Sequence, residues 1–162
     1  MTDITFFGSS YFLFPSYVLL ISYFLFARKN IRLAGDVAIV GFIGNQLLYL
    51  MQYVFHRQRP ADPLIQNVTG YSFPSGHSFA AFTFFGLLAY ITWQTQLQKV
   101  TKVILCVMFF IIATIIAGSR VYLHVHYASD VLGGFWLSMI WLSLSLWVLN
   151  EADKRILLLR GQ

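Results

Sequence analysis

Residues 100–117 read VTKVILCVMFFIIATIIA, an apolar run in which Lys102 is the only charged residue. A helix that crosses a bilayer needs about 20 apolar residues, with a range of about 17–25. This run falls within that range. In lipid its backbone must form a helix, because no water is present to satisfy its N–H and C=O groups. The stretch therefore predicts an integral membrane protein.

Four further apolar runs flank this one and are also long enough to span, the third of them only just: 6–26, 33–55, 77–93 and 128–149. The composition agrees, because 58% of the 162 residues are hydrophobic and only 10% are charged, against about 25% in an ordinary soluble domain. A soluble chain of this size could not bury so much apolar surface. We expect one all-α domain, residues 1–162, built as a bundle of five transmembrane helices.

Lysine and arginine residues are distributed unevenly between alternate loops. Eight lie on one side of the expected membrane, and only Arg57, Arg59 and Arg120 lie on the other. Cytoplasmic loops carry the excess of Lys and Arg, so the side with eight, which includes the carboxyl terminus, is predicted to be cytoplasmic. This clustering also explains the net charge of +5 without nucleic acid. The amino terminus has no basic region that would indicate a cleaved signal peptide.

Three polar motifs fall on the side that carries few basic residues. They are Arg59-Pro60 after the second run, Pro74-Ser75-Gly76-His77 at the third, and Ser119-Arg120 with His126 and Asp130 between the fourth and fifth. Successive spans cross the membrane in alternate directions, so every second connection lies on the same face. This helix parity alone brings the three motifs to one face of the membrane. The connection between residues 57 and 76 is broken by prolines and a glycine, so we expect a loop that covers this end of the bundle.

His126 and Asp130 are four residues apart near the start of the fifth run, so on a helix they share a face. If the carboxylate accepts a hydrogen bond from one imidazole nitrogen, the other nitrogen keeps a lone pair for nucleophilic attack. A purely structural pair at a helix start fits the same spacing, since a carboxylate is favourable there. From these two residues alone, both interpretations stay open.

A phosphate group is the ligand that the other motif residues suit best. Ser75 and Gly76 precede His77 at a helix amino terminus, where unpaired N–H groups bind anions and a histidine could donate a proton to a leaving oxygen. Arg59 and Arg120 could bind phosphate oxygens bidentately. An ordinary helix cap and arginines that reach lipid headgroups are the alternatives.

The remaining histidines and Arg57 give weaker signals. A zinc site would need His77, His124 and His126, but residues two apart point to different sides of a helix and other ligand types are few. We therefore expect no metal. His56 and His124 are expected at the membrane interface, and Arg57 is expected either to touch the same anion as Arg59 or to face solvent.

Together the motifs resemble the three signatures of the type 2 phosphatidic-acid phosphatase superfamily, which includes membrane lipid phosphatases, soluble acid phosphatases and vanadium haloperoxidases. They occupy residues 52–60, 74–77 and 119–130. The resemblance implies that His126 attacks phosphorus to form a phosphohistidine, that Asp130 orients it, and that His77 protonates the leaving group. It also implies that no metal or other cofactor is needed, and that the phosphoryl oxygens are held by Arg59, Arg120, Ser75 and the Gly76 backbone.

Two features depart from the family pattern. The first signature normally opens with a lysine seven residues before its arginine, and here that position holds Gln52. A neutral amide can still donate a hydrogen bond, so we assign Gln52 to substrate binding with one cation fewer in the pocket. Membrane members of the family typically have six spans, whereas five are expected here. The missing one would be the first, and a start of the gene assigned too far downstream would explain the difference equally well.

The expected activity is removal of phosphate from a lipid phosphate or diphosphate at the outer leaflet of a bacterial cell membrane, facing the periplasm or cell exterior. The resemblance ranks undecaprenyl diphosphate first, then phosphatidylglycerophosphate or phosphatidate, then lipid A 1-phosphate. Partners are this substrate and membrane lipids. Two other classes are a lipid-phosphate-binding relative that has lost its activity, and a transporter that uses Asp36, Asn45 and Gln46. The last three residues fit interhelical hydrogen bonding equally well.

Overall fold

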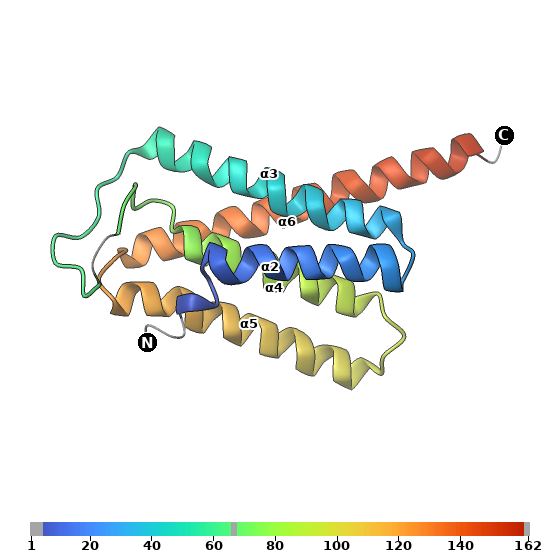
Figure 1. Cartoon of the computed structure of the whole chain (residues 1–162), viewed down its shortest axis with the longest axis horizontal. Helices are drawn as coiled ribbons and strands as arrows, with labels where there is room; N and C mark the ends of the chain where they lie inside the picture. Colours follow the sequence, from blue (N-terminus) through green and yellow to red (C-terminus); the bar gives the residue numbers. More distant parts are fainter. Residues whose placement is uncertain (1–4, 66–67, 161–162) are drawn as a thin grey trace.

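A computed structural model of the chain describes residues 5–65 and 68–160, with side chains described up to Ala152 and at Lys154. The elements found there are all helical: α2 (Ser10–Ser22), η1 (Tyr23–Ala27), α3 (Ile31–Phe55), α4 (Gly76–Trp93), α5 (Lys99–Tyr122) and α6 (Ala128–Arg160). The π-helical segment η1 continues α2, so the two form one rod. The rods lie side by side in one bundle (Figure 1), which confirms the predicted all-α architecture.

Four helical segments are long and apolar enough to cross a membrane: Ser10–Ala27, Ile31–Phe55, Lys99–Tyr122 and Ala128–Ala152. The fifth rod, α4, does not meet this criterion, although it runs beside the others. It packs against α5 and α6 and buries eight side chains, including Ser78 and Thr83. Because α4 faces other helices more than lipid, it can carry polar groups that a lipid-facing helix could not.

Helix boundaries differ from the sequence prediction at three places. The first rod begins at Ser10, because residues 7–9 form a turn in which Gly8 N–H donates to the Thr5 carbonyl and Ser9 N–H to the Phe6 carbonyl. Helix α5 continues past residue 117 to Tyr122. Helix α6 continues past residue 149 and leaves the bundle (Figure 1). Residues 150–160 are mostly good helix formers, so the helix need not end at the membrane boundary.

Small residues let the helices approach closely, as expected in lipid, where apolar surface alone does not drive helices together. A Cβ added to Gly44 of α3 would lie 2.6 Å from Nε1 of Trp141 on α6. That indole nitrogen donates to the Val40 carbonyl at 3.0 Å. A Cβ on Gly86 of α4 would lie 2.6 Å from Leu142. The α3–α6 and α4–α6 contacts therefore depend on glycine.

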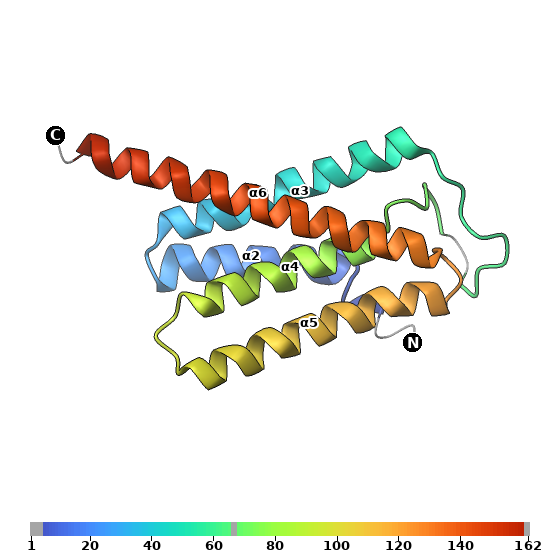
Figure 2. The same cartoon turned by 180° about the vertical axis from the view of Figure 1, so that it is seen from behind.

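The carboxyl ends of α3 and α5 and the amino ends of α4 and α6 lie at one end of the bundle (Figures 1 and 2). The long connection between α3 and α4 runs across this same end. The parity prediction is thus confirmed: the three polar motifs come from distant parts of the chain and meet at one end.

Candidate active site

His126 lies in the short connection between α5 and α6. Helix α6 begins at Ala128, so His126 precedes the helix, whereas the sequence predicted that it shares a helical face with Asp130. The prediction was wrong because Asp130 stands three residues after Tyr127 and its Oδ2 accepts the Tyr127 N–H at 2.9 Å. This is the reach of an N3 carboxylate back to an N-cap, which starts the helix after Tyr127. His126 Nδ1 and Asp130 Oδ2 nevertheless lie 3.6 Å apart.

The nearest acceptor for His126 is a backbone carbonyl. Nδ1 lies 2.8 Å from the Ser72 oxygen, which can only accept, so the geometry assigns the proton to Nδ1 and a lone pair to Nε2. The Ser72 hydroxyl donates to Asp130 Oδ2. Ser72 therefore stands between the histidine and the carboxylate that was predicted to orient it. Sequence reasoning missed Ser72, because a carbonyl oxygen carries no signature of residue type.

The surroundings of His126 keep its imidazole neutral. The residue is 3% exposed, and Nε2 lies 3.1 Å from Nη1 of Arg59. Burial, together with the positive charges of Arg59 and Arg120, lowers the pKa of His126 to about 3, although the Ser72 carbonyl acts in the opposite direction. At neutral pH the ring therefore carries the lone pair that a nucleophile requires.

Arg59 is held in a fixed orientation beside that lone pair. Its Nε donates to the Gly70 carbonyl at 3.0 Å and its Nη1 to the Val125 carbonyl at 3.0 Å. Its Nη2 donates to the Thr69 carbonyl at 3.1 Å. Burial lowers the pKa of Arg59, and the charge of Asp130 opposes this shift. A guanidinium group that is oriented by three carbonyls does not have to be ordered again when an anion binds.

Arg120 closes the site from the last turn of α5. It is 4% exposed, and its Nη1 donates to the Thr5 hydroxyl at 2.5 Å. Its Nε is buried and has no hydrogen-bond partner within residues 5–65 and 68–160. A buried cationic N–H without an acceptor is unusual and indicates a place for a ligand. His77 lies close enough to Arg120, His126 and Arg59 to interact electrostatically with each of them. The structure therefore brings these four predicted residues together.

Hydrogen bonds that involve backbone groups hold the loop before α4 against its neighbours. The Ser75 N–H donates to the Asp130 carbonyl at 3.0 Å, and its hydroxyl accepts from Ser78 at 3.2 Å. Gln52 Nε2 donates to the Pro74 carbonyl at 3.0 Å. Gly76 is the first residue of α4. The assignment of Ser75, Gly76 and Gln52 to substrate binding stays a prediction, and the observed contacts show that two of them also hold the loop in place.

Two of the weaker candidates have structural roles at the helix ends. His56 caps α3 in the left-handed conformation, with φ of 44°, and its ring packs against Tyr53 and Tyr71 at 4.8 and 4.5 Å. His124 is exposed and also has a positive φ, of 54°. In the described part of the chain, no three His, Cys, Asp or Glu side chains are grouped as metal ligands.

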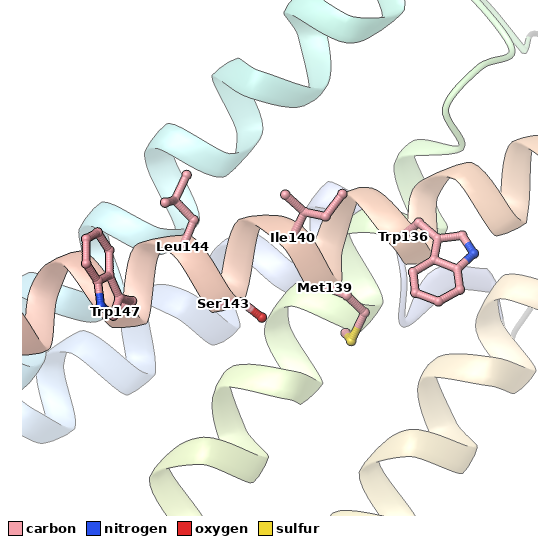
Figure 3. Close-up of a pocket in the computed structure, with 6 residues that line it drawn as sticks. All are labelled: Trp136, Met139, Ile140, Ser143, Leu144 and Trp147. Atoms are coloured by element: carbon pink, nitrogen blue, oxygen red, sulfur yellow. The ribbon is translucent and has the colours of Figure 1, made fainter.

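A shallow hollow opens on the surface of α6. It has a volume of about 490 Å³ and is lined by Trp136, Met139, Ile140, Ser143, Leu144 and Trp147 (Figure 3). Trp136 and Trp147 are 62% and 65% exposed. Such an apolar surface on a membrane helix faces lipid tails.

Comparison with known proteins gives the same assignment as the motifs. The family described as the PAP2 superfamily matches residues 10–154. Phosphatidylglycerophosphatase B of Bacillus subtilis (strain 168) is 34% identical over 143 residues, which cover 86% of this chain and 69% of the relative. YbjG of Escherichia coli (strain K12), a candidate undecaprenyl-diphosphatase, is 32% identical over 118 residues. That match covers 67% of this chain and 53% of the relative, so this chain spans about half the length of YbjG.

A solved structure agrees as well. The transmembrane PAP2-type phosphatidylglycerolphosphate phosphatase from Bacillus subtilis superimposes with a TM-score of 0.81 at 30% identity, over 96% of this chain and 75% of that one. The relatives are membrane hydrolases of lipid phosphates. The helices that cross the bilayer, the grouped histidines and arginines, and these matches lead to one conclusion: the chain belongs to the PAP2 superfamily of membrane phosphatases.

Proposed function

We propose that this protein removes phosphate from a membrane lipid through a covalent phosphohistidine on His126. The observation that carries the proposal is the position of Nε2, which holds its lone pair 3.1 Å from the fixed guanidinium of Arg59. A phosphorus atom in line with this nitrogen would have its oxygens next to Arg59 and the unpartnered Nε of Arg120. Phosphoryl transfer requires mainly such positioning and neutralisation of charge.

The reaction needs two displacements. In the first, the Nε2 lone pair forms the N–P bond while the bond from phosphorus to the lipid oxygen breaks. His77, which takes up a proton when the negatively charged phosphate binds beside it, gives that proton to the lipid oxygen. In the second, a water molecule gives a proton to His77 and attacks phosphorus. The N–P bond then breaks and inorganic phosphate leaves. Asp130 stabilises the positive charge that develops on the ring of His126.

The number of free cations favours a phosphate monoester as substrate. Arg59 and Arg120 lie beside the histidines, but Gln52 replaces the family's lysine, and Arg57 is paired with Asp130. The two permanent positive charges, those of the arginines, match a monoester dianion better than a diphosphate, which carries more negative charge. Phosphatidylglycerophosphate therefore moves ahead of undecaprenyl diphosphate, the substrate that the motifs alone ranked first. The similarity to phosphatidylglycerophosphatase B supports this order, and that to YbjG supports the second candidate.

The lipid tail would lie along α6. Trp136, at one end of the hollow, follows Asp130 by six residues, which is about 9 Å along a helix. A lipid whose phosphate reaches His126 could place its acyl chains against this apolar surface (Figure 3). The basic loops lie at the opposite end of the helices, and by the positive-inside rule this supports an active site at the outer face of the membrane.

A lipid panel tests this proposal directly. Purified protein in mixed micelles would be given phosphatidylglycerophosphate, phosphatidate, undecaprenyl diphosphate and lipid A 1-phosphate at equal surface concentration, with and without a chelator. We expect the highest kcat/KM with phosphatidylglycerophosphate and no effect of the chelator. A tenfold preference for undecaprenyl diphosphate would reverse the ranking. Neither phosphate release nor labelled protein with any lipid would instead indicate a lipid-phosphate-binding relative.

Gln52→Lys is expected to strengthen phosphate binding. The amide of Gln52 donates to the Pro74 carbonyl at the start of α4, and a lysine ammonium could keep this bond while adding a charge. A charge gained at a partly exposed site is worth on the order of 1 kcal/mol, so we expect the inhibition constant of inorganic phosphate to fall by about fivefold. Gln52→Met is the control, because it removes the hydrogen bond without adding charge. An unchanged constant in Gln52→Lys would mean that position 52 does not face the pocket.

A further inference from the structure

Arg57 precedes the phosphate-binding Arg59 by two residues, but it reaches a different part of the structure. Its Nη1 lies 2.7 Å from Asp130 Oδ1 and donates to the Ser129 hydroxyl at 2.8 Å. The centre of its guanidinium lies 4.3 Å above the ring of Tyr127. Ser129 and Asp130 lie in the first turn of α6, and Tyr127 directly precedes that helix. The position of Arg57 is therefore set by the residues next to His126.

Asp130 needs the charge that Arg57 supplies. Its side chain has no exposed surface, whereas that of Arg57 is 39% exposed. A carboxylate that is fully removed from water is stable only with a counter-charge or several donors. His126 is neutral and cannot provide that charge. Oδ2 is occupied by the Ser72 hydroxyl and the Tyr127 N–H, which leaves Oδ1 for the guanidinium of Arg57.

Arg57 is also connected to the second group that orients the histidine. Its carbonyl accepts the Ser72 N–H at 2.7 Å, and the Ser72 carbonyl accepts the proton on Nδ1 of His126. The side chain of Arg57 holds Asp130, which accepts from the Ser72 hydroxyl. Arg57 is thus connected to Ser72 in two ways, through its own backbone carbonyl and through the side chain of Asp130. A substitution at position 57 removes only the connection through the side chain.

We propose that Arg57 is a positioning residue, which holds Asp130 oriented toward Ser72 and His126 and does not bind the phosphate. The proposal rests on the catalytic role of His126 proposed above. When Nε2 attacks phosphorus, the ring of His126 gains positive charge, and the charge of Asp130 lowers the energy of that state. Without Arg57, the buried carboxylate of Asp130 loses its ion-pair partner at Oδ1 and its fixed orientation toward Ser72 and His126. This loss slows the chemical step and leaves ground-state binding of the phosphate largely unchanged.

The test compares kinetic constants of Arg57→Gln and Arg57→Lys with the wild type in mixed micelles of the preferred lipid. We expect Arg57→Gln to lower kcat by about 10–100-fold, by analogy with the loss of groups that orient metal-binding histidines. KM and the inhibition constant of inorganic phosphate should stay within about twofold of wild type. Arg57→Lys retains the charge and should recover part of kcat. Arg28→Gln, at an exposed position at the other end of the bundle, is the matched control and should behave as wild type.

A double-mutant cycle with Asp130→Asn separates this role from others. Asp130→Asn alone should lower kcat by orders of magnitude. In that background Arg57→Gln should have no further effect, because the interaction it removes is already lost. These rates would be measured as phosphoenzyme formation in a single turnover. An equal loss in both backgrounds would overturn the proposal, and so would a raised KM or inhibition constant with an unchanged kcat.

Two outcomes distinguish this inference from the proposed function. If the wild type releases no phosphate from any lipid, the proposed function fails. If the wild type is active and Arg57→Gln matches it in every constant, only the role of Arg57 fails. Should Arg57→Gln not yield folded protein, Arg57→Lys carries the test: its partial kcat with unchanged phosphate inhibition supports the proposal, and weaker phosphate inhibition contradicts it.

Discussion

His126→Ala is expected to abolish turnover, with kcat at least about 10³-fold below wild type. The substitution removes Nε2, the only nitrogen at this position that can form a bond to phosphorus. Arg59 and Arg120 remain, so the variant should still bind inorganic phosphate. Binding without turnover is the result that separates a lost nucleophile from a collapsed pocket.

The measurement is phosphate release together with covalent labelling by lipid that carries radioactive phosphate. Wild-type protein should hold label that is lost in acid and kept in alkali, as expected for an N–P bond, and His126→Ala should hold none. His124→Asn is the control. His124 is exposed and has a positive φ of 54°, which asparagine tolerates, so activity should be unchanged. Near-normal release by His126→Ala would remove the proposed nucleophile.

Gly134→Ala is expected to lower both activity and stability, although it adds only one methyl group. A Cβ at this position would lie 2.7 Å from the Ser75 carbonyl oxygen and 3.1 Å from the Phe79 nitrogen. Both are backbone atoms, so α6 and the start of α4 would have to separate. Overpacking of this kind costs about 1–3 kcal/mol. Asp130 and His77 lie on these two helices, so activity should fall more than stability.

Gly118→Ala is the matched control, because no atom lies within 4 Å of a Cβ added at that position. It lies in a helix of the same bundle, two residues before Arg120, and should keep wild-type activity and thermal stability. The comparison would be made by phosphate release and by thermal unfolding in detergent. If Gly134→Ala and Gly118→Ala behave alike, the close contact between α6 and the Ser75 loop does not control the site.

Several features of the fold and the site could be predicted from the sequence. Apolar runs identify spanning helices because lipid leaves the backbone no other choice, and parity then places distant loops at one end. That argument alone brought His77, Arg59, Arg120 and His126 together. The role of α4 was harder to predict, because hydrophobicity does not tell a helix that faces lipid from one that faces protein.

Other features depend on backbone positions, which residue types do not reveal. The sequence placed His126 on a helix with Asp130, but the reach of Asp130 to the Tyr127 N–H starts α6 after that point. The Ser72 carbonyl that orients the histidine could belong to any residue. The sequence left two interpretations for Arg57, contact with the same anion as Arg59 or exposure to solvent. Neither included Asp130, because the two residues are 73 positions apart in the chain.

The contact between Arg120 and Thr5 is expected to affect which lipids the site accepts. Nη1 of Arg120 donates an N–H to a hydroxyl from the amino-terminal segment, so a phosphate oxygen that approaches this N–H competes with an internal acceptor. A hydrogen bond to a charged oxygen is roughly twice as strong as one to a neutral oxygen. A phosphorylated headgroup can therefore displace the threonine, whereas diacylglycerol, with only a hydroxyl, gains little from the exchange. The resting enzyme would then discriminate against lipids that carry no phosphate.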